Sequence, residues 1–168
     1  MDDLERRMRR IEDRCALEDL NVRYFLASDD NDAATIAAAF AADAEFFASG
    51  TLCGSTRERI VRFIVEKRGT MGLSVHALQS TLFEFVGDDR ATGVVCAQLD
   101  FVQSGQAFTG ALRYYDEYVR EDRVWRFHKR DMLTVYLVAT EEIAKALPSA
   151  TPVHWPGQSP AQSDVSGR

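Results

Sequence analysis

The sequence predicts an α+β fold in which helices come first and cover one face of a curved, mainly antiparallel sheet. Two observations lead to this prediction. Apolar residues recur every three or four positions in the first third of the 168-residue chain, which is typical of amphipathic helices. From about residue 73 the pattern changes to runs rich in β-branched and aromatic residues, separated by short polar turns, which is typical of hairpins. Helices followed by antiparallel hairpins indicate the α+β class.

Three helices are expected before residue 70. The first is predicted by an apolar stripe made of Leu4, Met8, Ile11, Cys15, Leu17, Leu20, Tyr24 and Phe25. A polar run at 28–32 interrupts the stripe, because short polar side chains favour turns and helix N-caps. An alanine-rich helix at 33–40 follows. A third helix at 55–67 opens with a capping box formed by Ser55 and Glu58.

The strands are expected mainly in the second half of the chain. A short strand at 44–47 precedes a turn near Gly50 and Gly54. Four long strands in two hairpins are expected at 73–86, 91–103, 106–120 and 124–138. The first hairpin turns at the Gly-Asp-Asp sequence of 87–89, and the second turns at 121–123. A short helix at 140–147 ends the folded part.

The chain is expected to form one domain, residues 1–147, followed by a tail, residues 148–168. All four prolines lie in the tail, among Ser, Gly, Gln and Ala. This composition favours an extended or disordered segment, at least beyond Gly157. Trp155 is the exception, because its ring is costly to leave in water. We expect it to dock on the chain's own sheet or on a neighbouring copy.

Composition excludes several classes of protein. With 20 basic and 26 acidic residues, the net charge of −6 gives no basic surface for nucleic acid. No apolar run approaches the roughly 18 residues of a membrane span, and the acidic start of the chain lacks the features of a signal peptide. The cysteines, Cys15, Cys53 and Cys96, are odd in number and widely spaced, which predicts no disulfide framework. We therefore expect a cytoplasmic protein without membrane or nucleic-acid partners.

Common catalytic motifs are missing from the sequence. There is no GxGxxG or GxxxxGK[ST] phosphate loop, no HExxH or other tight His/Cys cluster, and no GxSxG nucleophile turn. We therefore expect no nucleotide, metal or other cofactor. Three histidines are present, His76, His128 and His154, and the last of them lies in the tail.

His76 lies in the apolar run at 73–78. A buried imidazole needs a partner, because an unpartnered polar group costs about 1–3 kcal/mol. The residue is either a core histidine bonded to a backbone carbonyl or a general base oriented by a carboxylate. Asp29 is either a turn residue or an acid that reaches into the concavity of the sheet. Tyr24 precedes it by a little over one helical turn, so both can line the same pocket mouth.

The order and spacing of many residues over 5–147 resemble a known family. The matching residues are Ala16-Leu17-Glu18-Asp19-Leu20, Tyr24, Asp29, Asp32, Phe40, Asp43, Gly54, Ser74-Val75-His76, Gly87-Asp88-Asp89-Arg90-Ala91, Tyr114, Asp116, Arg120 and Val124-Trp125-Arg126-Phe127. The chain resembles the SnoaL-like branch of the nuclear transport factor 2-like superfamily. Within that branch it is similar to the group containing scytalone dehydratase and hexachlorocyclohexane dehydrochlorinase.

This resemblance implies a cone-shaped, cystatin-like roll with the N-terminal helices on the concave face of the sheet. It also implies a pocket with a His–Asp pair, in which His76 removes a proton from substrate carbon and Asp29 orients the imidazole. Tyr24 falls where relatives often place a polar pocket residue, and Lys129 falls near a basic residue of the dehydrochlorinase. His128 should alternate to the face opposite Trp125, Phe127 and Lys129. The second catalytic histidine of scytalone dehydratase has no match.

The leading functional hypothesis is a cofactor-independent lyase or isomerase. It would catalyse dehydration, elimination or a double-bond shift on a small, largely apolar substrate. Cyclic molecules are among the expected substrates. One alternative is a pocketed protein that binds a small ligand without catalysis, since fold does not fix function. Another is a structural subunit of a ring-hydroxylating oxygenase, whose β subunits resemble this fold.

A homo-oligomer is also expected, with a trimer favoured and a dimer as the rival. The strands carry large apolar residues on both alternating sets, whereas a sheet with one solvated face should alternate with polar residues. The residues in question are Leu99, Phe101, Phe108, Tyr114, Tyr115, Tyr118 and Trp125, with Arg113 and Arg120 among them. We expect the assembly to form through the outer face of the sheet. The resemblance agrees, because the dehydratase and the dehydrochlorinase are trimers.

Overall fold

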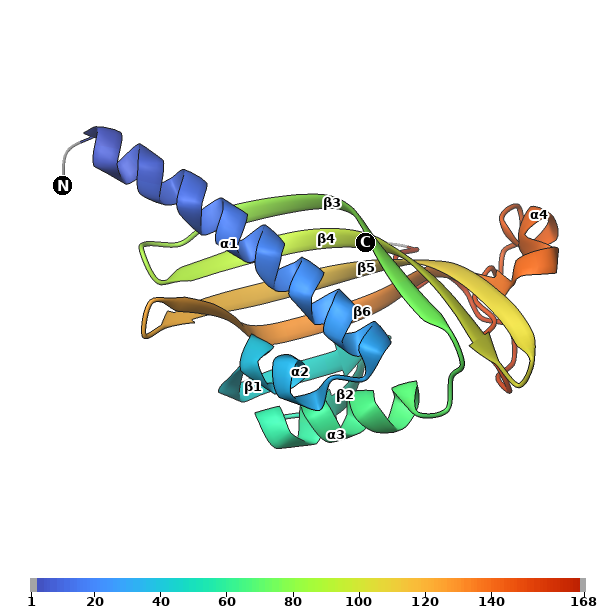
Figure 1. Cartoon of the computed structure of the whole chain (residues 1–168). Helices are drawn as coiled ribbons and strands as arrows, with labels where there is room; N and C mark the ends of the chain where they lie inside the picture. Colours follow the sequence, from blue (N-terminus) through green and yellow to red (C-terminus); the bar gives the residue numbers. More distant parts are fainter. Residues whose placement is uncertain (1–2, 167–168) are drawn as a thin grey trace.

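The computed structural model describes residues 3–166, in which helices cover one face of a curved, open six-stranded sheet (Figure 1). The predicted α+β class is therefore confirmed. In chain order the elements are α1 (Asp3–Asp30), α2 (Ala33–Ala39), β1 (Phe40–Ala48), β2 (Thr51–Gly54), α3 (Arg57–Arg68), β3 (Ser74–Phe85), β4 (Arg90–Gln103), β5 (Gln106–Glu121), β6 (Val124–Ala139), the 3-10 turn η1 (Thr140–Glu142) and α4 (Ile143–Ala146).

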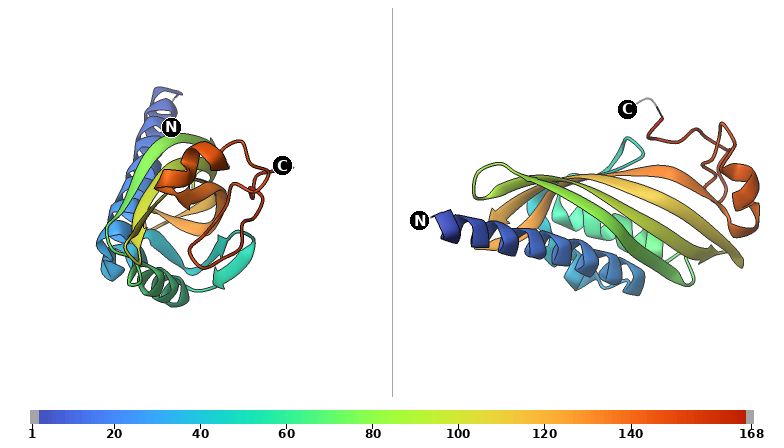
Figure 2. Two further views of the ribbon diagram at one scale, coloured as in Figure 1. Left: turned by 90° about the vertical axis from the view of Figure 1, so that its right-hand side faces the viewer. Right: turned by 90° about the horizontal axis from the view of Figure 1, so that it is seen from above.

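The strands lie in the order β2-β1-β6-β5-β4-β3, so β2 and β3 form the two edges. Only the β1–β6 pair is parallel among the described strands, and the other pairs are antiparallel. The long helix α1 crosses the sheet diagonally, while α2 and α3 cover its β1–β2 end (Figure 2). No described helix is long and apolar enough to cross a membrane.

Helix boundaries differ from the prediction by a few residues. The helix α1 runs through most of the polar run and ends at Asp30, after which Asn31 has a left-handed φ of 57°. Asp32 then caps α2, because its side chain accepts hydrogen bonds from the backbone N–H groups of the first turn. The N-cap of α3 is Thr56, one residue after the predicted Ser55. The short strand β2 occupies the region expected to form only a turn.

The apolar residues of α1 form two stripes and not the single stripe that the sequence predicted. Leu17, Tyr24 and Phe25 are buried against the sheet. The earlier set, Leu4, Met8, Ile11 and Cys15, lies on the exposed side. The step from Cys15 to Leu17 is two residues, a rotation of about 200° around the helix, which moves the pattern to the opposite side.

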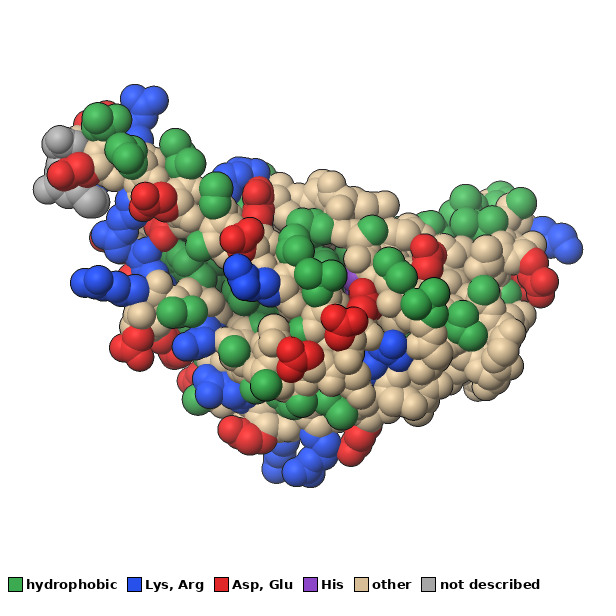
Figure 3. All heavy atoms as spheres, in the orientation of Figure 1, with side chains coloured by type: hydrophobic (Ala, Val, Ile, Leu, Met, Phe, Trp, Pro, Cys, Tyr) green, Lys and Arg blue, Asp and Glu red, His purple; other side chains and the backbone are tan. Residues whose placement is uncertain are grey.

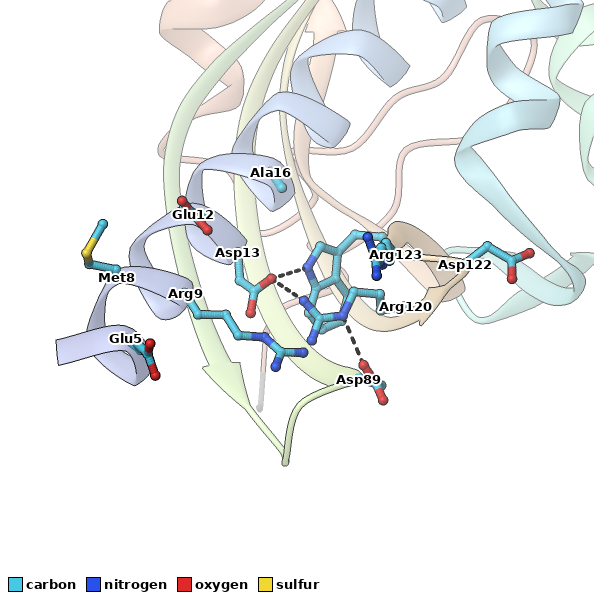
Figure 4. A pocket seen from close by; sticks show the side chains of 11 residues that line it. Glu5, Met8, Arg9, Glu12, Asp13, Ala16, Asp89, Arg120, Asp122 and Arg123 are labelled. Carbon is cyan, nitrogen blue, oxygen red and sulfur yellow. Dashed lines mark hydrogen bonds and ion pairs between the residues drawn. The ribbon is translucent and has the colours of Figure 1, made fainter. Parts of the chain in front are cut away.

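The N-terminal half of α1 is fixed to the ends of the hairpins by Asp13 (Figure 4). Its buried carboxylate accepts hydrogen bonds from Arg120 Nη1 at 2.6 Å and from Trp125 Nε1 at 2.9 Å. Arg120 also donates from Nε to Asp89 in the β3–β4 turn at 2.9 Å. The helix is therefore held rigidly where it reaches the edge of the sheet.

Six of the seven large residues that suggested an oligomer interface are buried within the single chain, whereas Tyr115 is partly exposed. Leu99, Phe101, Phe108, Tyr114, Tyr118 and Trp125 are all buried in the monomer. The alternate positions on the outer face carry a polar network, in which Thr109 bonds to Asp100 at 2.6 Å and Gln98 bonds to Thr109 at 2.8 Å. The pocketed interior accounts for six of these large residues, so they give little support to assembly through the outer face of the sheet, which stays a prediction.

The tail packs against the chain's own sheet. Val153 forms a parallel bridge to Leu137 at the end of β6, and the Trp155 ring stacks on Phe101 with centroids 6.0 Å apart. Asp164 accepts hydrogen bonds from Thr134 N at 2.7 Å and from Ser49 Oγ at 2.6 Å. The carboxylate therefore attaches the end of the tail to β6 and to the turn after β1 at once.

Candidate active site

A cavity of about 380 Å³ lies between the concave face of the sheet, the C-terminal half of α1, α3 and the tail. Its apolar wall includes Phe46, Phe63, Ile64, Met71, Leu99, Leu112, Met132 and Trp155. Polar groups come from Tyr24, Ser28, Ser49, Thr51, Thr70, Ser74, His76, Gln103, Tyr114 and Gln158, and cationic groups from Lys67 and Arg68. Small ligands are commonly bound in cavities of this size and composition.

His76 and Asp29 are in direct contact at the wall of this cavity. His76 Nδ1 lies 2.7 Å from Asp29 Oδ1, within hydrogen-bond distance. Both side chains are mostly buried, with exposed fractions of 14% and 11%. The ring of Phe25 stacks on the imidazole at 5.1 Å, with an angle of 3° between the planes. The contact with Asp29 therefore fixes the direction in which the imidazole points, and the stacking on Phe25 fixes the plane of its ring.

Three donors from the start of β3 surround the Asp29 carboxylate. Ser74 Oγ and His76 Nδ1 lie within 2.8 Å of Oδ1, and the backbone N–H of His76 donates to Oδ2 at 2.7 Å. Ser74 and His76 are two residues apart on the strand, so their side chains lie on the same face. Arg68 donates to the backbone oxygen of Asp29 at 2.8 Å and ties the end of α3 to the end of α1.

These contacts determine the charge of Asp29. Burial alone would raise the pKa of the carboxyl group, but the side-chain and backbone hydrogen bonds of His76 and that of Ser74 hold its pKa below the ordinary value. The group is therefore a carboxylate at neutral pH. An ionised acceptor at Oδ1 favours the tautomer in which Nδ1 carries the proton, so Nε2 is the ring nitrogen with a free lone pair.

Tyr24 lines the same cavity, in line with its predicted position. Its ring packs edge-on against Phe40 and Phe127, and burial raises the pKa of its phenol. The phenol stays protonated at neutral pH and can donate a hydrogen bond.

Lys129 does not line the cavity. The prediction that it lies on the same face of the strand as Phe127 is wrong. The β5–β6 register shifts between Glu117 and Tyr118, which pair with Lys129 and Phe127, so His128 is the extra residue of a β-bulge. Beyond the bulge the alternation is reversed. Lys129 lies on the outer face, 4.0 Å from Glu117. His128 lies 3.7 Å from Asp43.

The same bulge turns Arg130 inward, under the floor of the cavity. Its guanidinium is fully buried and lies 4.5 Å from the Tyr24 ring centroid and 4.1 Å from that of Tyr114. Asp116 Oδ1 is 3.4 Å from Nε, and Asn21 Oδ1 accepts from Nη2 at 2.9 Å. The place of Arg130 could not be predicted from the sequence, because strand alternation gives no sign of the extra residue.

Lys67 and Arg68 are the cationic residues that line the cavity, and both come from the last turn of α3. Lys67 Nζ lies 5.9 Å from the centroid of the Phe63 ring. From the sequence alone these residues are explained by their position at the end of a helix, because basic side chains there interact favourably with the helix dipole. They therefore gave no sign of a place in the cavity. No group of three or more His, Cys, Asp or Glu side chains that could hold a metal occurs within residues 3–166.

A family model described as a SnoaL-like domain matches residues 9–131, most of the chain. None of the curated proteins matches the chain by sequence. The solved structure of LinA is 26% identical, with a TM-score of 0.73 over 79% of this chain and 92% of LinA.

Two further solved structures share the fold at lower identity. A hexachlorocyclohexane dehydrochlorinase, LinA type 2, is 21% identical, with a TM-score of 0.74 over 90% of this chain and 99% of that protein. A scytalone dehydratase-like protein from Novosphingobium aromaticivorans is 18% identical, with a TM-score of 0.72 over 90% of this chain and 97% of that protein.

Proposed function

Because this chain belongs to the SnoaL-like domain family, we propose that it is a cofactor-independent lyase or isomerase that uses His76 and Asp29 as its general base. The observation that carries the proposal is the 2.7 Å contact between the imidazole and an ionised carboxylate at the wall of a largely apolar cavity. This arrangement matches the requirement that a base be oriented and be within reach of the substrate.

The proposed reaction begins when His76 Nε2 takes a proton from a substrate carbon. Asp29 accepts the hydrogen bond from Nδ1–H and stabilises the imidazolium that forms. In an elimination, the electron pair of the broken C–H bond forms a C=C bond. Hydroxide or halide leaves from the neighbouring carbon and takes the electron pair of the bond that joined it to that carbon. In an isomerisation, the imidazolium returns the proton to a different carbon.

Two groups in the cavity can stabilise the negative charge that develops on the substrate. The Tyr24 phenol is a neutral donor, and the Lys67 ammonium supplies positive charge at the wall. Arg130 is separated from the cavity by the rings of Tyr24 and Tyr114, so it acts on the site through its field and through the position of those rings.

The cavity also indicates the class of substrate. Most of its lining is apolar or aromatic, so a small and largely apolar molecule, such as one with a single ring, fits it. The names of the LinA and scytalone dehydratase-like structures suggest loss of chloride or of water as the first reactions to examine.

The proposal is tested by following proton removal in deuterium oxide. The purified protein is incubated with chlorinated cyclohexanes, cyclic β-hydroxy ketones and unsaturated ketones, and products and deuterium exchange are measured by mass spectrometry. We expect one class to react or to exchange. His76→Ala should lose this activity, while His128→Ala, which changes a histidine on the outer face, should keep it.

Two results would contradict the proposal. If a ligand binds in the cavity with neither turnover nor exchange, the protein is a binding protein. If the activity of His76→Ala equals that of the unmodified protein, the base lies elsewhere.

A further inference from the structure

The N-terminal half of α1 exposes an apolar stripe on the side that faces away from the sheet. Leu4, Met8 and Ile11 have exposed fractions of 63%, 53% and 65%, and Cys15 is also exposed. Green side chains lie along the outer side of these turns (Figure 3). Isolated exposed apolar residues are ordinary, but four in one row on a helix indicate a contact surface.

The spacing of the four residues is that of a coiled-coil seam. The steps from Leu4 to Met8, Ile11 and Cys15 are four, three and four residues, which places Leu4 and Ile11 at d positions and Met8 and Cys15 at a positions of a heptad. The next d position is Glu18, which turns aside to accept a hydrogen bond from Thr81 of β3 at 3.1 Å. The apolar seam therefore ends at Cys15.

The stripe is presented by a rigid helix. Asp13, on the opposite side of α1, is bound by Arg120 and Trp125. In Figure 4, Asp13 points toward this cluster, whereas Met8 and Glu12 point away from it. Because the helix is already formed and fixed, a partner would not have to order it, which lowers the entropic cost of binding.

The charges beside the seam indicate which partner fits it. Arg7 and Arg14 occupy the g positions on one flank, and Glu5, Glu12 and Asp19 occupy the e positions on the other. In a parallel, in-register pair of identical helices, g residues meet e residues five positions further along the partner. Arg7 then faces Glu12 of the second copy, and Arg14 faces Asp19. In an antiparallel pair, Arg would face Arg and acid would face acid.

We propose that a second copy of this chain binds to this stripe, so that two α1 helices pair in parallel through Leu4, Met8, Ile11 and Cys15. The assembly expected from the sequence relied mostly on residues that are buried in the monomer, so this surface is proposed in place of the outer face of the sheet. The seam ends 14 residues before Asp29, about 21 Å along the helix. Pairing can therefore be tested independently of the proposed catalytic site.

The first test is the mass in solution, measured by light scattering during size-exclusion chromatography over a range of concentrations. The expected mass is twice that of the 18.9 kDa chain. Ile11→Glu places a charge in the seam and should return the mass to that of one chain. Leu147→Glu makes the same kind of change at an exposed site near the tail and should leave the dimer intact. A monomer or a trimer of the unmodified protein, or a dimer of Ile11→Glu, overturns the proposal.

The second test is cross-linking with oxidised glutathione, which accepts the two electrons lost when two thiols join. In a parallel pair, every a position faces its own copy. The unmodified protein should form a disulfide-linked dimer, Cys15→Ser should not, and Cys15→Ser with Met8→Cys should form it again. In an antiparallel pair centred on residue 15, the two residues at position 8 would be about 21 Å apart, too far for a disulfide. Failure of the position 8 cross-link therefore excludes the parallel arrangement.

The third test exchanges the flanking charges. Arg7→Glu should weaken the dimer, because acid then faces Glu12 of the partner. Arg7→Glu combined with Glu12→Arg restores the opposite signs and should restore the dimer. A double variant that associates no better than the single variant would show that the two residues do not meet.

Discussion

Asp29 illustrates how one residue can have a structural and a chemical role at the same time. It is the penultimate residue of α1, and its two oxygens accept from Ser74, from the His76 side chain and from the His76 backbone. The backbone bond fixes the start of β3, and the side-chain bond fixes the imidazole. Its residue type and position in a polar run allowed only a turn residue or a pocket acid, and the structure shows that it ends a helix and reaches a strand.

The first prediction at this scale concerns the coupling of Asp29 and His76. Asp29→Asn keeps the shape of the side chain but removes the negative charge that holds Nδ1–H, and His76→Ala removes the base. Each variant should lose most of the turnover of the substrate found in the deuterium experiments while keeping its far-ultraviolet circular dichroism. Residues that act as one unit are not additive, so the double variant should be little worse than either single variant.

Independent losses that multiply in the double variant would contradict this prediction. Ser74→Ala serves as the matched control, because it removes one hydrogen bond from Asp29 but leaves both members of the pair. It should reduce turnover by less than Asp29→Asn does.

The residues that sequence analysis could and could not place differ in one physical respect. Tyr24 and Asp29 lie on one helix and His76 on a regular strand, so the helical and strand periods placed them on their elements, while the pairing of His76 with Asp29 was expected from the family resemblance. Lys129 and Arg130 lie just after the bulge at His128. One extra residue reverses the face of every residue that follows, and its position depends on the partner strand.

At the scale of elements, the tail forms part of the cavity wall. Trp155, Pro156 and Gln158 line the cavity, and Asp164 fixes the end of the tail to β6 and to the turn after β1. The composition of residues 148–168 predicted an extended or disordered segment, at least beyond Gly157, but not the contacts that Asp164 makes with the sheet. The attachments are an isolated β-bridge, side-chain hydrogen bonds and one stacked ring, which no periodic pattern encodes.

The prediction for this element concerns Asp164. Asp164→Ala removes two hydrogen bonds to a carboxylate, each worth about 1.5–3 kcal/mol, and should loosen the tail. Trp155 should then become more accessible, so quenching of tryptophan fluorescence by acrylamide should increase. Glu142→Ala, at an exposed acid just before the tail, should leave quenching unchanged. Equal quenching of Asp164→Ala and the unmodified protein would show that other contacts hold the tail.

At the scale of the whole molecule, the fold class could be predicted because helices and hairpins are separated along the sequence. The sheet order could not be read from the residues in the same way. The edge strand β2 is four residues long, and β1 pairs in parallel with β6, the most distant strand along the chain. The surface available for assembly also required the structure, since only burial shows which of the two stripes of α1 is exposed.

The last prediction concerns the stability of the whole molecule as a function of pH, through Asp116. Burial raises the pKa of this carboxyl group to about 6 in the folded protein, and the nearby Arg130 only partly offsets that effect. In the unfolded chain the pKa returns to about 3.8. Between these values the folded protein binds a proton that the unfolded chain has released. Raising the pH from about 4 to about 6 therefore favours unfolding, by on the order of 3 kcal/mol from this one group.

Asp29 acts in the opposite direction and in a different range. Its pKa is lowered in the folded protein, so its contribution to stability is present above the unfolded value and is lost as the pH falls through the lower folded value. The contributions of the two carboxylates can therefore be separated by urea unfolding from pH 4 to pH 7, with Asp116→Asn as the variant.

Relative to Asp116→Asn, the free energy of unfolding of the unmodified protein should fall as the pH rises from 4 to 6 and then stay constant. The amide that replaces the carboxyl group cannot titrate and resembles the protonated acid, so the two proteins should be similarly stable near pH 4. Above pH 6 the variant should be the more stable of the two, by on the order of 3 kcal/mol. Glu117→Gln, a neighbouring exposed acid, should give a curve parallel to that of the unmodified protein. Parallel curves for Asp116→Asn as well would mean that Asp116 is ionised in the fold throughout, and that Arg130 outweighs the effect of burial.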